Sequence, residues 1–302
     1  MISQKVDCVF NGIYHLGEGP IWNMQFQKLY WTNIYQRRIW VYDPTTQQSR
    51  IFWEGDHQVG GFAFTRAGGM VFCTDHGVYL FSSNQVSRLL GEQIPRLLFN
   101  IPMAPDEIFN DITVDPSGRI FAGTLDRKFS TGTLFRLEKG KLPVQVLTGV
   151  RCSNGMTFSM DEKFFFHTDS LRYAITRYDY DLATGKIGRP MVFYQGDESQ
   201  GVPDGITLDS ENHLWVAFWD ASVVRWLNPS GKSVEEIPIP AKQPSSVMFG
   251  GTNLTDLYIT SACEGAEDIT SGYDEKGVFL GGPMYRYRAS VPGRAEWLAD
   301  LE

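Results

Sequence analysis

Residues 110–124, NDITVDPSGRIFAGT, carry the pattern that decides the fold. Two short apolar runs flank Asp115-Pro116-Ser117-Gly118, in which proline, serine and glycine favour the backbone angles of a turn. The first run belongs to a phrase that occurs six times: EGPIW at Glu18, GGFAF at Gly60, NDITV at Asn110, NGMTF at Asn154, DGITL at Asp204 and SSVMF at Ser245. The intervals are 42, 50, 44, 50 and 41 residues. A repeat of this length is typical of the blades of a β-propeller.

A second apolar strand follows each phrase and keeps a small residue in one column. That column holds Thr32, Thr74, Gly123, Thr168, Ala217 and Thr260. A third strand then alternates with period two, as in residues 223–226. The pattern predicts an all-β fold, a six-bladed β-propeller that residues 1–302 form as a single domain. We expect residues 5–10, ahead of the first phrase, to pair as an outer strand with the last blade, because closure of the ring removes exposed sheet edges.

The composition argues against several classes of function. The 302 residues carry a net charge of −8 and form no basic stripe, so we expect neither nucleic acid nor a membrane as partner. No run approaches the ~18 apolar residues of a membrane span, and the N-terminus lacks the pattern of a signal peptide. We therefore expect a cytoplasmic protein. The cysteines, Cys8, Cys73, Cys152 and Cys263, form no CxxC pair, and we interpret them as free thiols.

The first residue of the repeated phrase indicates a metal site. In a propeller the innermost strands run along the central axis, so equivalent positions form a ring at one mouth of the channel. Glu18, Asn110, Asn154 and Asp204 occupy that position in four phrases. Two carboxylates and two amide oxygens suit a hard cation such as Ca²⁺, Mg²⁺ or Mn²⁺. Asn-Gly and Asp-Gly pairs are also ordinary turn formers, but four oxygen-bearing side chains in one column favour the metal.

Ordered motifs along nearly the whole chain carry a resemblance. They are Glu18-Gly19-Pro20 with Trp22, Asn110-Asp111 with residues 114–119 and 122–124, Ser153-Asn154-Gly155, Pro203-Asp204-Gly205 with residues 214–217, and residues 249–251 with 257–261. In these segments the chain resembles the SMP-30/gluconolactonase/LRE-like family, also called regucalcin-like. The resemblance implies a six-bladed propeller that hydrolyses a small-molecule sugar lactone.

The resemblance also implies the roles of three residues. Glu18, Asn154 and Asp204 match the ligands of one divalent metal ion, for which we expect Ca²⁺ first and Mg²⁺, Mn²⁺, Zn²⁺ or Fe²⁺ as alternatives. A metal ion at this place would polarise the lactone carbonyl. Asp204 is also our candidate for the general base that takes a proton from the attacking water, because the resemblance and its axial position agree.

On the substrate side the chain departs from the family pattern. The asparagine that contacts substrate in the family matches Asn110, but Ile108 stands where the family usually has an arginine. A glutamate of the best-known members aligns near Arg127, with Asp126 beside it. These departures affect the choice of gluconolactone more than lactone hydrolysis itself.

Two other functions stay open from the sequence. One is a phosphotriesterase-like hydrolase on the same metal, and the other is a non-enzymatic propeller that binds Ca²⁺ or a protein partner. Residues 264–282 are polar and rich in glycine, which fits either a lid over the site or a solvated insertion. We interpret Asp75, Asp169 and His167 as structural residues, although the two aspartates end strands near the predicted mouth.

Overall fold

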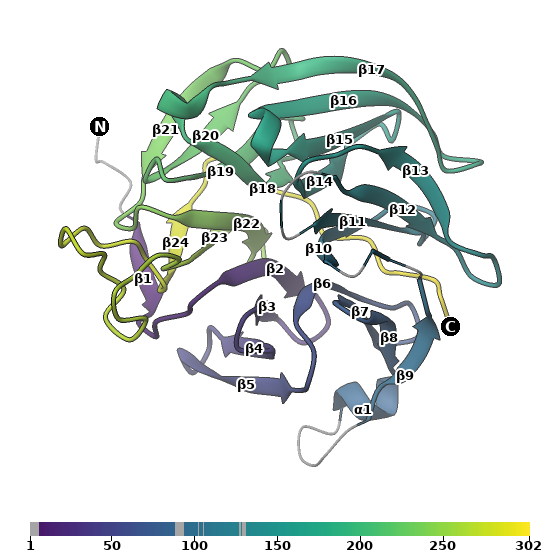
Figure 1. Ribbon diagram of the computed structural model, residues 1–302, viewed down its shortest axis with the longest axis horizontal. Coiled ribbons are helices and arrows are strands. Elements are labelled where there is room, and N and C mark those ends of the chain that lie inside the picture. The colour runs from purple at the N-terminus through teal and green to yellow at the C-terminus, as the bar shows by residue number, and fades with distance from the viewer. Residues whose placement is uncertain (1–5, 88–93, 102, 105, 127, 129–130) are drawn as a thin grey trace.

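The computed structural model describes residues 6–87, 94–101, 103–104, 106–126, 128 and 131–302. Within them the strands form six four-stranded antiparallel sheets around a central axis (Figure 1). The prediction of a six-bladed β-propeller is confirmed. The helices of the described residues are short: α1 (Ser83–Ser87) and the 3-10 turns η1 (Ser170–Arg172) and η2 (Glu198–Gln200). None of them has the length and apolar character that a membrane crossing requires.

Each blade contributes one strand to the channel and three strands outside it. The inner strands are β2 (Gly17–Asn23), β6 (Val59–Phe64), β10 (Glu107–Val114), β14 (Ser153–Phe158), β18 (Val202–Leu208) and β22 (Pro244–Gly250). The second strands are β3 (Lys28–Asn33), β7 (Met70–Thr74), β11 (Ile120–Asp126), β15 (Phe164–Asp169), β19 (Leu214–Trp219) and β23 (Asp256–Ser261). The third strands are β4 (Arg38–Asp43), β8 (Gly77–Phe81), β12 (Thr133–Leu137), β16 (Ala174–Asp181), β20 (Val223–Leu227) and β24 (Met284–Arg288). The outer strands are β5 (Gln48–Glu54), β9 (Arg96–Phe99), β13 (Val144–Thr148), β17 (Lys186–Gln195), β21 (Ser233–Pro238) and β1 (Asp7–Phe10).

The ring is closed by strands from both ends of the chain. β1 pairs antiparallel with β24, with Cys8 opposite Tyr285. Each inner strand also contacts the inner strands of both neighbouring blades, including β2 against β22. All four cysteines are free, as the sequence predicted.

Apolar side chains fill the gaps between neighbouring blades. Among the described residues there are six buried clusters, one for each gap. Trp31, for example, is fully buried between the last and first blades and stacks on Trp40 with 6.2 Å between ring centroids. Full burial of a large apolar side chain stabilises the fold by about 1.5–3 kcal/mol, so these clusters fix the positions of the inner strands.

Every inner strand has a β-bulge at the start of the repeated phrase. The register between inner and second strands shifts between Glu18 and Ile21, Val59 and Gly61, Phe109 and Ile112, Ser153 and Met156, Pro203 and Ile206, and Pro244 and Val247. A bulge leaves a residue outside the ladder and changes the direction of its side chain. The repeated bulge therefore leaves residues at the start of all six phrases outside the regular strand pairing at the same end of the channel. In the first blade these are Gly19 and Pro20, and Glu18 itself pairs with Thr32.

Side chains at the mouth hydrogen-bond from one blade to the next. The Thr32 hydroxyl donates to the carbonyl of Val59 at 2.8 Å, and the Asn110 amide donates to the carbonyl of Ser153 at 2.9 Å. At Gly123, which holds the same column as Thr32, a Cβ atom would lie 1.9 Å from the Ser153 hydroxyl. The column of small residues is therefore explained by the close approach of the next blade.

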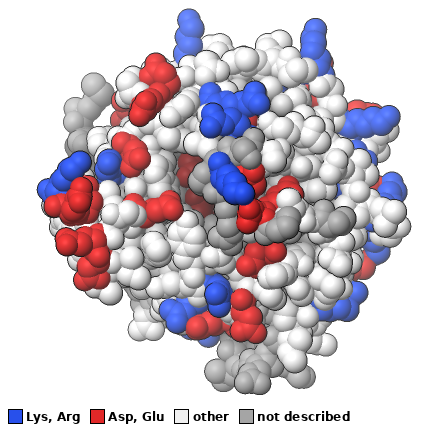
Figure 2. Space-filling view, viewed as in Figure 1, with Lys and Arg blue, Asp and Glu red and all other residues white. Residues whose placement is uncertain are grey.

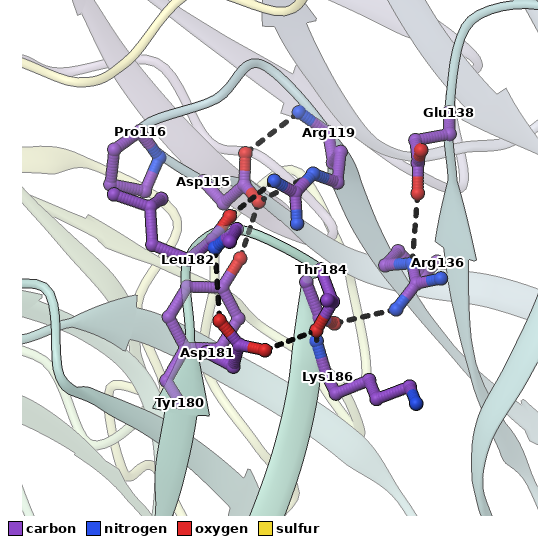
Figure 3. A network of polar contacts seen from close by, with 12 residues as sticks. Asp115, Pro116, Arg119, Arg136, Glu138, Tyr180, Asp181, Leu182, Thr184 and Lys186 are labelled. Atoms are coloured by element: carbon purple, nitrogen blue, oxygen red, sulfur yellow. Dashed lines mark hydrogen bonds and ion pairs between the residues drawn. The ribbon is translucent and has the colours of Figure 1, made fainter.

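A polar network joins blades 3 and 4 (Figure 3). Asp115, in the turn between β10 and β11, accepts hydrogen bonds from the hydroxyl of Tyr180 and from the backbone N–H of Arg119. The Arg119 guanidinium lies 3.3 Å from the Asp115 carboxylate and donates to the carbonyl of Leu182. Arg136 donates to the carbonyl of Gly185 at 2.7 Å. The network holds the β16–β17 hairpin against blade 3.

After β24 the chain crosses the face opposite the mouth (Figure 1). Gly293 donates to the carbonyl of Leu254, Ala299 to that of Phe64 and Asp300 to that of Gly118. These carbonyls belong to hairpins between inner and second strands or to the ends of inner strands, so the segment closes the far side of the channel.

Candidate active site

Three side chains from different blades lie buried at the start of their inner strands. Glu18 on β2, Asn154 on β14 and Asp204 on β18 are 7%, 8% and 5% exposed. Figure 2 shows acidic side chains on the floor of a hollow at the centre of the ring. The structure thus brings the three predicted metal ligands to one mouth of the channel.

Hydrogen bonds orient the donor atoms of this group. The Asn154 amide nitrogen donates to the Ser170 hydroxyl at 3.1 Å, and Ser170 donates to the carbonyl of Pro203 at 2.7 Å. This arrangement uses the amide nitrogen and leaves the amide oxygen of Asn154 for a ligand. Glu18 accepts from the backbone N–H of Gly19 at 3.0 Å, where a φ of +52° favours glycine. One oxygen of Asp204, Oδ1, is buried and has no hydrogen-bond partner among the described residues.

The carboxyl groups of the channel raise one another's pKa. Burial raises the pKa of Glu18 to about 8, and the charge of Asp111 adds to the shift. Burial also raises the pKa of Asp204, and the charges of Glu18, Asp111 and Glu264 act in the same direction. For Asp111, burial and the charge of Glu296 raise the pKa to about 7. Several buried carboxyls, one of them with an unpartnered oxygen, fit a divalent cation, because a cation would remove both the repulsion and the unmet hydrogen-bonding capacity.

Sequence reasoning did not select Asp111 as a functional residue. The position after the first residue of the phrase holds glycine or serine in the other blades: Gly19, Gly61, Gly155, Gly205 and Ser246. In blade 3 the same position holds a carboxyl that acts on both Glu18 and Asp204. A charged residue in a column of glycine and serine was the signal available in the sequence.

The predicted substrate residues lie on blade 3. Asn110 is fixed by its hydrogen bond to Ser153, and Ile108 is half-buried two residues before it on β10. Asp126 is buried at the end of β11, and its carboxylate accepts from the backbone N–H of Thr131 at 3.3 Å. Arg127 lies outside the described residues.

Asp169 and His167 have structural partners. The Asp169 carboxylate accepts from the backbone N–H groups of Arg151 and Cys152, both at 3.1 Å. His167 lies 2.8 Å from the hydroxyl of Ser153, and burial lowers its pKa to about 4, which keeps the ring neutral. These contacts agree with the structural roles that the sequence indicated.

The segment 264–282 begins beside the mouth and extends past β1 at the rim of the ring (Figure 1). Glu264 accepts a hydrogen bond from the Tyr35 hydroxyl at 2.9 Å, and Tyr273 packs on Phe279. The segment therefore has contacts of its own, and its role as a lid stays a prediction.

A cavity of about 330 Å³ occupies the other half of the channel. Its walls include Phe62, Met156 and Trp297, and Asp111 stands between it and the carboxyls of the mouth. Glu18, Asn154 and Asp204 do not line it. Mostly apolar walls are a poor match for a molecule rich in hydroxyl groups, so we assign the chemistry to the mouth and not to this cavity.

Comparison with known proteins adds to this geometry. The family model of the SMP-30/Gluconolactonase/LRE-like region matches residues 16–263. The chain is 32% identical to the pentonolactonase XacC of Haloferax volcanii, over 95% of each chain. It is 33% identical to the 6-deoxy-6-sulfogluconolactonase of Pseudomonas putida, over 98% of each chain. Among solved structures, a luciferin-regenerating enzyme is similar with a TM-score of 0.89 at 26% identity, covering 99% of this chain and 100% of that one.

Proposed function

Because the chain belongs to the SMP-30/gluconolactonase/LRE-like family, we propose that it hydrolyses a sugar lactone to the open-chain sugar acid at the mouth of its channel. The observation that carries the proposal is the buried group Glu18, Asn154 and Asp204, in which Asp204 keeps an unpartnered oxygen. Relatives that bear the names pentonolactonase and 6-deoxy-6-sulfogluconolactonase support a lactone as substrate.

Glu18, Asn154 and Asp204 would hold one divalent metal ion. Their donor atoms are all oxygens, which favours a hard cation, and Ca²⁺ is our first choice ahead of Mg²⁺ and Mn²⁺. Such an ion supplies a Lewis acid that polarises the lactone carbonyl and stabilises negative charge on its oxygen.

Asp204 would act as the general base. Its Oδ1 atom has no hydrogen-bond donor among the described residues, so this oxygen can accept a proton from a water molecule beside the lactone carbonyl. Asp204 takes a proton from water as the water oxygen bonds to the carbonyl carbon. The bond between the carbonyl carbon and the ring oxygen then breaks, and Asp204 gives its proton to that oxygen, which becomes a hydroxyl of the sugar acid.

Asn110 and Ile108 would face the substrate from blade 3, with Asp126 and Arg127 as further candidates. The Asn110 nitrogen is occupied by the carbonyl of Ser153, so the amide oxygen is the atom that can accept from a substrate hydroxyl. Ile108 offers only apolar surface. We therefore propose a lactone with fewer hydroxyl groups than gluconolactone.

A pH-drop assay tests the proposal. Metal-reconstituted protein is mixed with pentonolactones, gluconolactone, a 6-substituted gluconolactone and one organophosphate, and acid release is followed. Release from at least one lactone above the uncatalysed rate is expected. Hydrolysis of the organophosphate alone, or of nothing in the panel, would overturn the proposal and favour a phosphotriesterase or a non-enzymatic propeller.

Elemental analysis tests the metal separately. Chelated and reconstituted protein should hold close to one equivalent of divalent ion, and Glu18→Gln should lower both metal content and activity, because a neutral ligand replaces a charged one. Full occupancy and full activity in Glu18→Gln would remove Glu18 from the ligand set.

A further inference from the structure

A second group of metal-binding side chains lies on blade 2. His57, Asp75 and His76 each offer one ligand atom, and among the described residues these atoms lie within 4.8 Å of one another. His57 precedes β6, and Asp75 with His76 forms the turn between β7 and β8. None of the three belongs to the carboxyl and amide group that we assign to lactone hydrolysis.

Backbone contacts hold these residues in place. His76 donates its backbone N–H to the Thr74 hydroxyl at 3.0 Å, and that hydroxyl donates to the carbonyl of Gly77 at 3.1 Å. Gly77 has a φ of +138°, which side chains rarely allow, so the turn has a defined shape. Asp75 donates its backbone N–H to the carbonyl of Gln58 at 3.3 Å, which ties the turn to the loop that carries His57.

The polar atoms of the group converge but do not satisfy one another. Nδ1 of His57 lies 3.5 Å from Oδ1 of Asp75, longer than an ordinary hydrogen bond. That Asp75 oxygen is buried and has no hydrogen-bond partner among the residues the structure describes. The His76 ring lies 4.5 Å from the His57 ring, tilted by 53°. An ion pair with His57 would partner that oxygen only at this long distance, and it would give the second imidazole, that of His76, no role.

We propose that His57, Asp75 and His76 form a second metal site that binds Zn²⁺. Tetrahedral Zn²⁺ with ligands at its usual bond lengths places neighbouring donor atoms roughly 3.3 Å apart. The His57–Asp75 distance of 3.5 Å already fits, and the exposed His76 offers a ligand atom within 4.8 Å of the other two. Three protein ligands leave a fourth position for water.

The two sites should select different ions. Two imidazoles and one carboxylate suit Zn²⁺ and other first-row transition ions, whereas Ca²⁺ prefers oxygen ligands such as those of Glu18, Asn154 and Asp204. Because Zn²⁺ would join the loop before β6 to the β7–β8 turn, its binding should also stabilise blade 2. This inference does not depend on lactone hydrolysis.

Zn²⁺ titration in the presence of excess Ca²⁺ tests the site. Wild-type protein should bind one equivalent of Zn²⁺ while it keeps its Ca²⁺, and Tm should rise. His57→Gln and His76→Gln should each weaken Zn²⁺ binding by about 100-fold or more, since even loss of a residue behind a ligand costs 10–100-fold. Copper-loaded protein should show nitrogen coupling from two imidazoles in its electron paramagnetic resonance spectrum, and from one imidazole in each variant.

Two controls separate this site from the channel. His15→Gln removes a histidine that packs against Tyr35 and should leave Zn²⁺ binding unchanged. Glu18→Gln should lower Ca²⁺ content and keep Zn²⁺ binding. Equal Zn²⁺ affinity in wild type and both His57 and His76 variants, with equal Tm values in chelator to show intact folds, would overturn the proposal. Release of one Ca²⁺ for each Zn²⁺ bound would overturn it as well.

Discussion

Asp115 in blade 3 and Asp204 in blade 5 are both buried carboxylates, yet their surroundings are opposite. Asp115 is fully buried, and its oxygens accept from the Tyr180 hydroxyl and the Arg119 backbone, with the Arg119 guanidinium beside them. Asp204 has one oxygen without a partner, and acidic side chains surround it. The chain itself therefore supplies partners for the Asp115 carboxylate, whereas one oxygen of Asp204 needs a partner from outside the described residues.

The repeat extends the comparison to a third carboxylate. Asp209 follows Asp204 by five residues, as Asp115 follows Asn110. Asp209 is fully buried and accepts from the indole N–H groups of Trp215 and Trp226 at 3.1 and 2.8 Å. Burial of a carboxylate thus does not mark a functional residue in this fold. A buried carboxylate oxygen without a hydrogen-bond donor from the chain is the better mark of a functional residue, because an unpaired buried charge is costly unless a ligand binds it.

The largest effect should come from Asp204→Asn. Loss of a general base typically lowers the rate by 10²–10⁴-fold, and we expect that loss in kcat under saturating metal. The free energy of unfolding of the chelated protein should not fall, because the substitution removes repulsion with Glu18 and Asp111. Steady-state assays and urea denaturation measure the two quantities.

Metal content decides how this result is interpreted. If Asp204→Asn retains metal and hydrolyses lactones at the wild-type rate, Asp204 is not the base. If instead the chelated variant is several kcal/mol less stable than chelated wild type, Asp204 resembles Asp115 and the comparison fails.

Asp115→Asn should give the reverse pattern. It leaves the buried Arg119 without its counter-charge, and breaking a buried ion pair typically costs 3–5 kcal/mol. The midpoint of urea denaturation should fall accordingly, while kcat per folded molecule stays unchanged, because Asp115 and Arg119 lie in the β10–β11 turn, at the end of the blade opposite the mouth. A stable variant with reduced kcat would contradict the structural role.

The buried, neutral His167 should make the stability of the protein depend on pH. Its folded pKa of about 4 lies below the ordinary value of 6.5, so the unfolded chain takes up the proton first as pH falls. Stability should therefore be full above pH 6.5 and decline between pH 6.5 and 4, by roughly 3 kcal/mol at 1.36 kcal/mol per pKa unit. Urea denaturation of wild type and His167→Gln from pH 7 to 4 measures the decline. If the free energy of unfolding falls with pH by the same amount in both proteins, a group other than His167 causes the loss of stability in acid.

The repeat made the fold and the ligand positions predictable, but not the details that create the site. The period of the phrase and its small-residue column predicted six blades, and the columns of Glu18, Asn154 and Asp204 predicted that they meet at one mouth. The bulges could not be predicted, because they depend on strand pairing and not on local composition. Asp111 was missed because its effect comes from burial beside carboxyls of other blades, which a one-dimensional pattern does not show. The cluster on blade 2 was missed for the same reason, since His57 is distant in sequence from Asp75 and His76.

The smallest effect should come from Ile108, which we propose as part of the wall that faces the substrate. An apolar side chain there cannot donate to a sugar hydroxyl, and each buried hydroxyl left unmatched costs about 1–3 kcal/mol. Gluconolactone should therefore be a poorer substrate than a pentonolactone, and Ile108→Arg should reduce the difference in kcat/KM by about tenfold, equal to 1.4 kcal/mol. Ile108→Leu keeps the apolar surface and should leave the preference unchanged. If wild-type protein turns over gluconolactone best in the panel, another donor binds its hydroxyl groups. The proposed contrast between metal ligands on β2, β14 and β18 and an apolar substrate wall on β10 is then wrong.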